Sequence, residues 1–174
     1  MAADLDQLFD TLEQAQAARS LPPVHAWNPE HEGAIDIVVQ RDGTWLHEGT
    51  PFERQALVRL FSTVMRREGE AYYLVTPAEK LAITVEDAPF VALDFESRGQ
   101  GDDLELIFTT NSGDHVVADA EHQIWVEHER PYLHVRDGLN ALIARAAFYR
   151  LVELAEENAD GWSITSRGAA FQLS

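Results

Sequence analysis

The sequence contains no cysteine, and its positive charge is sparse. Without cysteine, disulfide frameworks, thiolate metal sites and cysteine nucleophiles are excluded. Long hydrophobic runs are absent too, since none approaches the roughly 20 apolar residues of a membrane span. The first 20 residues carry acids where a secretory signal has a basic and then an apolar region, namely at Asp4, Asp6, Asp10 and Glu13. From these absences we expect a cytoplasmic protein without a membrane partner.

The balance of charge argues against polyanionic partners. Thirteen Lys and Arg residues oppose 30 acids, which gives a net charge of −17. Such a chain repels phosphate backbones and anionic lipid surfaces, so we expect no nucleic-acid polymer as partner. Residues 86–129 hold 12 acids and one arginine, whereas residues 130–150 carry four arginines and a single acid, Asp137. A small anion could still be bound where positive charge is concentrated.

The 174 residues, 45% of them hydrophobic, are enough for a globular protein of one medium or two small domains. Apolar residues at helical spacing predict an N-terminal helix from about Leu5 to Ser20. Pro22 and Pro23 then open an irregular connector. We therefore assign residues 1–23 to an N-terminal helix and connector.

Runs of apolar and alternating residues after the connector predict a strand-rich α+β protein with antiparallel sheets. Arg41-Asp42-Gly43 separates the first two runs, and its Asp-Gly pair is a hairpin signal. The expected strands are residues 35–40, 44–47, 71–75, 80–86, 89–96, 103–110, 115–118, 122–128, 131–135, 162–166 and 169–173.

Two long helices are expected among these strands. The first spans about Pro51 to Arg67, where Thr50, Pro51 and Glu53 form a capping-box pattern with proline at the first helical position. The second spans about Gly138 to Asn158 and is apolar nearly all round, which is typical of a helix buried on more than one face.

The two helices belong to segments that resemble one another. Trp45-Leu46-His47 matches Tyr132-Leu133-His134, residues 57–61 match residues 148–152, and residues 72–74 match residues 162–164. Strand, loop, helix and strand recur in one order, which indicates an internal duplication. Chance similarity of amphipathic patterns is the alternative. We divide the chain into a first α+β repeat unit at 24–86 and a second at 87–174.

The run AYYLVTPAEKLAITVEDAPFVALDF at residues 71–95, with LVRLF, FTTN and RPYLHV, resembles the bacterial family named domain of unknown function 1285. The resemblance covers about Gly33 to Leu154. It implies two related α+β units, the second of them pleckstrin-homology-like. It further implies a nucleotide-like ligand at the interface of the units and a role in signal transduction, with no activity established. One departure is His122-Gln123, where the family more often has His-Pro.

Catalytic and metal-binding patterns find little support. His122 and His128 would share one face of a continuous strand, but no compact ligand set accompanies them, and a solvated acidic strand explains them better. No nucleophile elbow surrounds any serine, and 30 acids make any chosen carboxylate pair uninformative. We therefore expect no catalytic residue, no metal and no cofactor.

The candidate ligand-binding residues are cations, one amide and two aromatic side chains in or near the repeated segments. Cations would hold an anion, asparagine would read an amide or base edge, and the aromatic rings would stack. The set is Trp45, Arg59, Lys80, Asn111, Tyr132 and Arg136. Each has a plainer alternative, such as a solvated charge for Arg59, an ion pair with Asp87 for Lys80 and a turn for Asn111.

The sequence therefore predicts a small-molecule-binding module that senses an anionic, nucleotide-like ligand at the interface of two repeat units. A protein-protein interaction module, whose sheet edge grips a peptide or partner, is the alternative. An enzyme of unrecognised type is a third possibility. Ligand identity, oligomeric state and pathway stay open.

Overall fold

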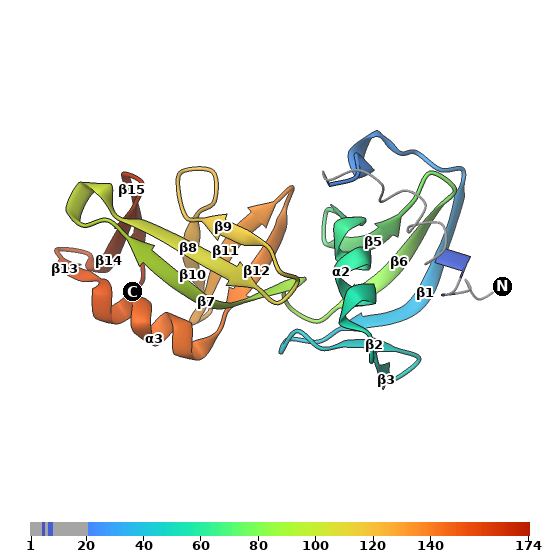
Figure 1. The fold of residues 1–174 in the computed structure, drawn as a ribbon, viewed down its shortest axis with the longest axis horizontal. Coiled ribbons are helices and arrows are strands. Elements are labelled where there is room, and N and C mark those ends of the chain that lie inside the picture. The colour runs from blue at the N-terminus through green and yellow to red at the C-terminus, as the bar shows by residue number, and fades with distance from the viewer. Residues whose placement is uncertain (1–4, 6, 9–20) are drawn as a thin grey trace. The chain divides into compact units, whose positions relative to one another are not determined.

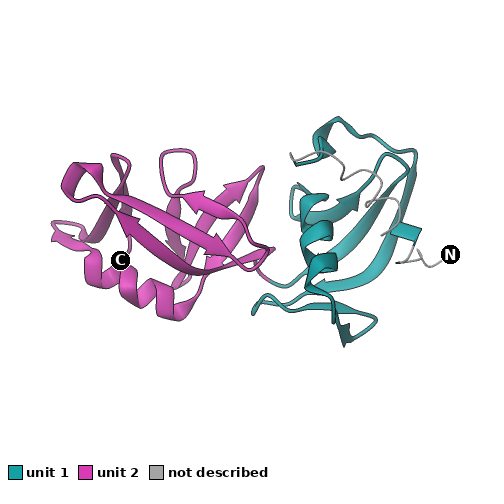
Figure 2. Ribbon diagram, in the orientation of Figure 1, with its two compact units in different colours: residues 1–86 teal, residues 87–174 magenta. Residues whose placement is uncertain are grey.

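The computed structural model describes residues 5, 7, 8 and 21–174, and the chain divides into two compact units at 1–86 and 87–174 (Figure 2). The helix expected from Leu5 to Ser20 lies outside the described residues except for Leu5, Gln7 and Leu8, which are helical. Leu8 is buried.

Unit 1 is built on a six-stranded sheet with the order β3-β2-β1-β6-β5-β4 (Figure 1). Neighbouring strands are antiparallel except for β1 and β6, which run parallel. A short 3-10 helix, η1 (Val24–Ala26), precedes the sheet. The strands are β1 (His31–Val39), β2 (Trp45–His47), β3 (Thr50–Pro51), β4 (Met65–Glu68), β5 (Ala71–Val75) and β6 (Glu79–Val85).

Helix α2 (Gln55–Thr63) lies across one face of this sheet (Figure 1). Its inward residues are Val58, Leu60 and Phe61, and Phe61 is fully buried. Phe52 makes edge contacts with both Phe61 and Trp45, at ring-centroid distances of 5.9 and 6.4 Å. A line of three aromatic rings therefore joins the helix to β2 across the core of unit 1.

Unit 2 contains a second six-stranded sheet, β10-β11-β12-β7-β8-β9, and a three-stranded sheet, β13-β14-β15. Helix α3 (Arg145–Leu154) packs against β7 and β14, and the 3-10 helix η2 (Gly101–Asp103) closes the β7–β8 connection. The strands are β7 (Phe90–Arg98), β8 (Glu105–Thr110), β9 (His115–Val117), β10 (Ile124–Glu127), β11 (Arg130–Arg136), β12 (Leu139–Ile143), β13 (Glu156–Asn158), β14 (Gly161–Ser166) and β15 (Ala169–Gln172).

The expectation of purely antiparallel sheets is wrong, because each six-stranded sheet contains one parallel pair. In unit 1 that pair is β1–β6, and in unit 2 it is β7–β12. In both cases the strands are far apart in the chain, so the crossover that a parallel pair requires is available. The sheets are mixed, and the α+β class with few helices holds.

The first long helix is much shorter than predicted. Thr50 and Pro51 pair with β2 as strand β3, and α2 starts only after Arg54, which makes no side-chain capping bond. At the other end, Met65 to Glu68 pair with β5. Local helical periodicity predicted the middle of this segment correctly, and strand pairing at both ends overrode it.

The segment expected to form the second long helix, at about 138–158, instead forms strand β12, helix α3 and strand β13. Asp137 and Gly138 both have positive φ, so they form the tight turn between β11 and β12. Residues 139, 141 and 143 are buried in alternation, as one face of a strand requires. The Asp-Gly hairpin signal that was recognised at residues 42–43 was missed here.

The strand orders of the two units support a duplicated topology. In chain order, strands β10, β11 and β12 correspond to β1, β2 and β3, and strands β13, β14 and β15 correspond to β4, β5 and β6. This correspondence reproduces every antiparallel pair of unit 1. The helix falls between the third and fourth counterparts in both units. Strands β7 to β9 are an addition of unit 2. One pairing differs: β1 and β6 are joined, whereas β10 and β15 are not.

The proposed match of Trp45 with Tyr132 places the two rings on different faces. Trp45 is buried and Leu46 half-buried, whereas Tyr132 is half-buried and Leu133 buried. Because side chains alternate along a strand, a shift of one residue exchanges the faces. Trp45 therefore corresponds in burial to Leu133.

Replacing Phe61 with alanine should destabilise unit 1 by about 3–5 kcal/mol, because a fully buried ring that contacts Phe52 is lost and a cavity remains. Urea denaturation followed by the NMR amide signals of unit 1 measures this change. Arg59→Ala, on the exposed side of the same helix, is the matched control and should change the unfolding free energy by less than about 0.5 kcal/mol. Equal effects of the two substitutions would contradict the assigned burial.

Candidate functional site

The three candidate residues of unit 1 have different surroundings. Trp45 is 3% exposed and belongs to the aromatic line described above, so its ring is a core ring. Arg59 lies on the exposed side of α2. Both positions follow from the local structure: β2 turns every second side chain inward, and α2 turns Arg59 away from the stripe formed by Val58 and Phe61.

Lys80 is held between two acids and a ring. Its ammonium lies 2.8 Å from a carboxylate oxygen of Glu68 and 3.5 Å from one of Glu32, and 4.4 Å from the centroid of the Tyr73 ring. The hydrogen bond to Glu68 raises the pKa of Lys80, and the same bond lowers the pKa of the Glu68 carboxyl. The expectation of an ion pair with Asp87 is wrong, because Lys80 pairs with Glu68 and Glu32 instead.

Arg66 falls within the helix expected from Pro51 to Arg67, but it is a buried residue of β4. One guanidinium nitrogen donates to the carbonyl oxygens of Val24 and Trp27, and the other contacts Glu68 at 2.6 Å. Arg66 and Lys80 thus share Glu68, and Arg66 ties η1 to the sheet. Sequence reasoning missed this role because it placed Arg66 on the wrong kind of element.

In unit 2, Asn111 follows β8 and Arg136 ends β11, and both contact the first two residues of β7. The Asn111 side-chain oxygen accepts a bond of 2.9 Å from the Val91 amide. The Arg136 guanidinium stands over the Phe90 ring, 5.1 Å from its centroid, and donates to Asp114 at 3.0 Å. The structure therefore brings these two candidates to neighbouring residues of one strand.

Tyr132 lies on the opposite face of β11 from the core and is stacked on Trp125 of β10, with ring centroids 5.7 Å apart. Its hydroxyl donates to Asp87 at 2.8 Å. Burial, and next the bond to the negatively charged Asp87, raise the pKa of the Tyr132 phenol. The stacked Tyr132 ring therefore restricts the position of the Trp125 ring.

Trp125 is one wall of a hollow in unit 2, with a cavity volume of about 510 Å³. The hollow lies between β10 and β15, and its lining residues are Ala120, Gln123, Ile124, Trp125, Val126, Ala169, Ala170, Phe171, Gln172 and Ser174. All of these side chains are uncharged. The volume falls within the range of small-molecule sites, which is roughly 300–1,000 Å³.

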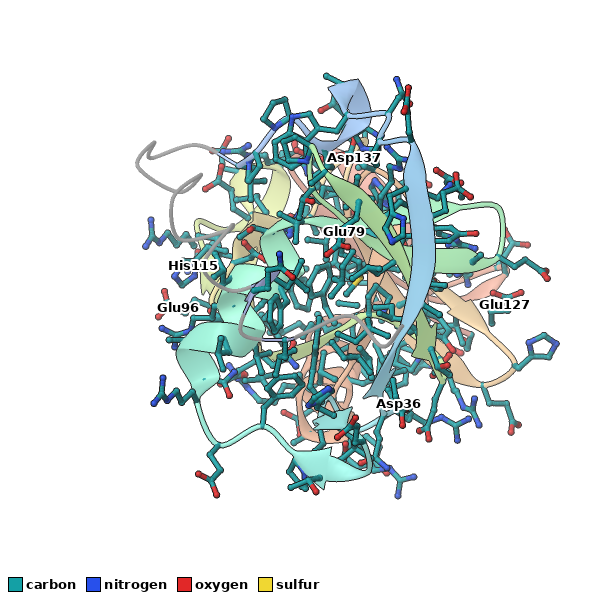
Figure 3. All side chains as sticks on the ribbon, turned by 90° about the vertical axis from the view of Figure 1, so that its right-hand side faces the viewer. Asp36, Glu79, Glu96, His115, Glu127 and Asp137 are labelled. Carbon is teal, nitrogen blue, oxygen red and sulfur yellow. The ribbon has the colours of Figure 1, made fainter. Side chains whose placement is uncertain are left out.

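No acidic residue is among the residues that line this hollow. Glu96 and Glu127 are exposed and stand at the periphery of the molecule in Figure 3. Gln123 and Gln172 contribute amides, Ser174 a hydroxyl, and Trp125 aromatic surface, whereas the Phe171 side chain is 5% exposed and belongs mainly to the core. The hollow can therefore form hydrogen bonds and stack, but it provides no group that transfers protons at neutral pH.

Within the described residues, no group of three or more His, Asp or Glu side chains is close enough to hold a metal ion. His122 and His134 do stack, with ring centroids 6.3 Å apart, and they bond to Asp119 and Asn140. Among the same residues, no helix combines the length and the apolar character needed to cross a membrane.

The structure therefore brings together some of the candidates predicted from the sequence. Asn111 and Arg136 contact adjacent residues of β7, Val91 and Phe90, and Tyr132 is stacked on Trp125, which lines the hollow. Trp45, Arg59 and Lys80 belong to unit 1 and are not joined to one another by any interaction described above. Sequence reasoning missed Gln123, Trp125, Phe171 and Gln172, since only the pairing of the strands reveals that β10 and β15 leave a hollow.

These features define a two-unit α+β protein in which each unit contains a six-stranded mixed sheet. Residues 22–88 match the model of the N-terminal domain of DUF1285, a domain of unknown function, and residues 89–173 match that of the C-terminal domain of the same family. The chain belongs to the DUF1285 family.

Solved structures of the family agree with this assignment. A DUF1285 family protein from Silicibacter pomeroyi DSS-3 is 45% identical, with a TM-score of 0.87 over 98% of this chain and 94% of the other. A DUF1285 family protein from Shewanella baltica OS155 is 29% identical, with a TM-score of 0.56 over 67% of this chain and 90% of the other. No curated protein matches the chain.

The raised pKa of Tyr132 predicts that unit 2 loses stability in alkali. Below pH 10 the Tyr132 phenol is protonated in both the folded and the unfolded protein. Above pH 10 the phenol of the unfolded protein ionises first, which favours unfolding. The stability that Tyr132 contributes is therefore lost as the pH rises through the pKa of the folded state. Unfolding free energies at pH 8 and 11 should differ less in Tyr132→Phe than in the parent chain. Tyr149→Phe, at an exposed phenol on α3, is the control and should leave the difference unchanged.

Proposed function

We propose that this protein is a binding module, and that its ligand occupies the hollow between β10 and β15 of unit 2. The observation that carries the proposal is the lining: aromatic surface from Trp125 beside amide and hydroxyl groups, with no charged side chain. Mostly apolar walls with a few placed polar groups are typical of ligand sites. We further propose that occupancy of this site serves signalling rather than catalysis.

The chemistry of the lining favours an uncharged ligand. An anion would find no cation in the hollow, and the chain as a whole carries a net charge of −17. Among the predicted cations, Lys80 is paired with Glu68 and Arg136 with Asp114. An anionic ligand at either would have to replace a carboxylate, which costs much of the attraction that it gains.

The nucleotide-like ligand at the junction of the two units stays a prediction. The pleckstrin-homology-like architecture of unit 2 stays a prediction too. A six-stranded sheet, a smaller sheet and one helix on β7 and β14 are compatible with it. Neither is needed for the site proposed here, whose residues all belong to unit 2.

A thermal-shift screen with two panels tests the proposal. Uncharged amides and heterocycles should raise the melting temperature of the parent chain; a ligand at 100 times its Kd stabilises by about 2.7 kcal/mol. Trp125→Ala, which removes a wall of the hollow, should abolish this stabilisation. Trp162→Ala, at an exposed tryptophan of β14 outside the lining, should preserve it.

The second panel contains nucleotides. One outcome would contradict the proposed site and favour an anionic ligand: only nucleotides raise the melting temperature, and this effect is lost in Arg136→Ala but kept in Trp125→Ala. Absence of stabilisation in both panels would count against a small-ligand site of either kind.

A further inference from the structure

The hollow in unit 2 lies along the backbone edges of two strands. Its lining includes four consecutive residues at 123–126 and four at 169–172. Side chains of neighbouring strand residues point to opposite faces, so consecutive residues can line one hollow only where it runs along the strand edge. Strands β10 and β15 are both edge strands of their sheets. We call this hollow the edge slot.

Hairpin geometry shows which backbone groups of β10 face the edge slot. His128 and Glu129 both have positive φ, as in the tight two-residue turn that joins β10 to β11, and the His134 amide donates to the Gln123 carbonyl. Residues 123, 125 and 127 therefore bond to β11, because ladder bonds alternate along an antiparallel pair. The N–H and C=O groups of Ile124 and Val126 point the other way, into the slot.

The same reasoning applies to β15. Arg167 and Gly168 form the tight turn to β14, and the Leu173 amide donates to the Trp162 carbonyl. Residues 169, 171 and 173 therefore bond to β14. Ala170 and Gln172 turn their N–H and C=O groups toward the slot, where no ladder of the described residues pairs them.

In unit 1 the corresponding strand edges are paired with each other. The counterparts β1 and β6 form a parallel ladder with no slot. In unit 2 the β14–β15 hairpin is held by other partners. The Ser166 hydroxyl accepts from the Leu106 amide and donates to the Ala118 carbonyl, and the Arg167 amide donates to the Leu104 carbonyl. These bonds anchor the hairpin to β8 and its surroundings, so β15 does not close onto β10.

We propose that the edge slot binds an extended peptide segment, which pairs its backbone with β10 and β15 and restores the missing part of the sheet. This inference rests on the proposed function and names the ligand class. Only an extended peptide offers N–H and C=O groups on both of its edges at the spacing of a strand. Uncharged walls suit apolar side chains, and the acids near the ends of β10, Glu121, Glu127 and Glu129, suit basic residues flanking them.

Insertion requires some widening of the slot. A strand between two others needs about 9.6 Å between its neighbours, that is, two strand spacings. Some Cα atoms of β10 and β15 are within 8 Å of each other. The hairpin must therefore move away from β10 where the strands approach, while Ser166 and Arg167 hold its turn.

The test uses the full chain and a random heptapeptide library displayed on phage. A selected peptide is synthesised with Lys flanks, and its affinity is measured by calorimetry. Ala170→Trp, which fills the slot, should weaken binding at least tenfold, whereas Ala155→Trp, outside the lining, should not. Circular dichroism checks that both variants fold. N-methylation of alternate peptide amides, in either of the two sets, should also weaken binding about tenfold, since each set loses hydrogen bonds to one edge.

Amide hydrogen exchange locates the bound peptide. Protection should rise at Ile124, Val126, Ala170 and Gln172 and stay unchanged at Trp125 and Phe171, whose amides already belong to ladders. A peptide that binds without protecting these four amides, or equally well to Ala170→Trp, overturns the inference. Selection of no peptide, while an uncharged compound stabilises the parent chain through Trp125, overturns the peptide and leaves the proposed function standing. Failure of both overturns both.

Discussion

The backbone N–H and C=O groups along the edge of a strand need hydrogen-bond partners, and the two units provide them differently. In unit 1 the long strands β1 and β6 join in parallel and close the sheet between its two halves. In unit 2 the short strands β10 and β15 stand at the same place in the topology with their outer edges unpaired. Unpaired edges attract further strands, so proteins rarely leave them accessible without a use or a cover. The candidate site of this protein is a consequence of that one unmade pairing.

Charge is arranged so that most cations of the described structure serve the fold. Arg66 and Lys80 share Glu68, Arg136 pairs with Asp114, and Arg150 pairs with Asp94 while lying over the Phe95 ring. In so acidic a chain these cations find carboxylates close by. The hollow in unit 2, by contrast, is lined by uncharged side chains alone, so it is a more distinctive feature than a paired arginine.

Most strands could be predicted from alternation, and β5 was predicted with its exact bounds at Ala71–Val75. The two long helices show why other elements could not. Residues 65–68 continue a helical pattern, and only their pairing with β5 makes them a strand. Residues 139–143 are apolar at both strand and helix spacing, and the turn at Asp137 and Gly138 decides between the two. Local preferences differ by too little to overcome a ladder of backbone hydrogen bonds.

The sequence by itself determined the family, the α+β class and the presence of two related segments, because these depend on local patterns and on residue identity. Tertiary structure decided which edges pair, that Trp45 is a core ring while Trp125 lines a hollow, and that Lys80 meets Glu68 and not Asp87. These outcomes depend on contacts between residues far apart in the chain. The sequence of a strand alone does not specify which other strand it will pair with, or whether its edge will stay unpaired.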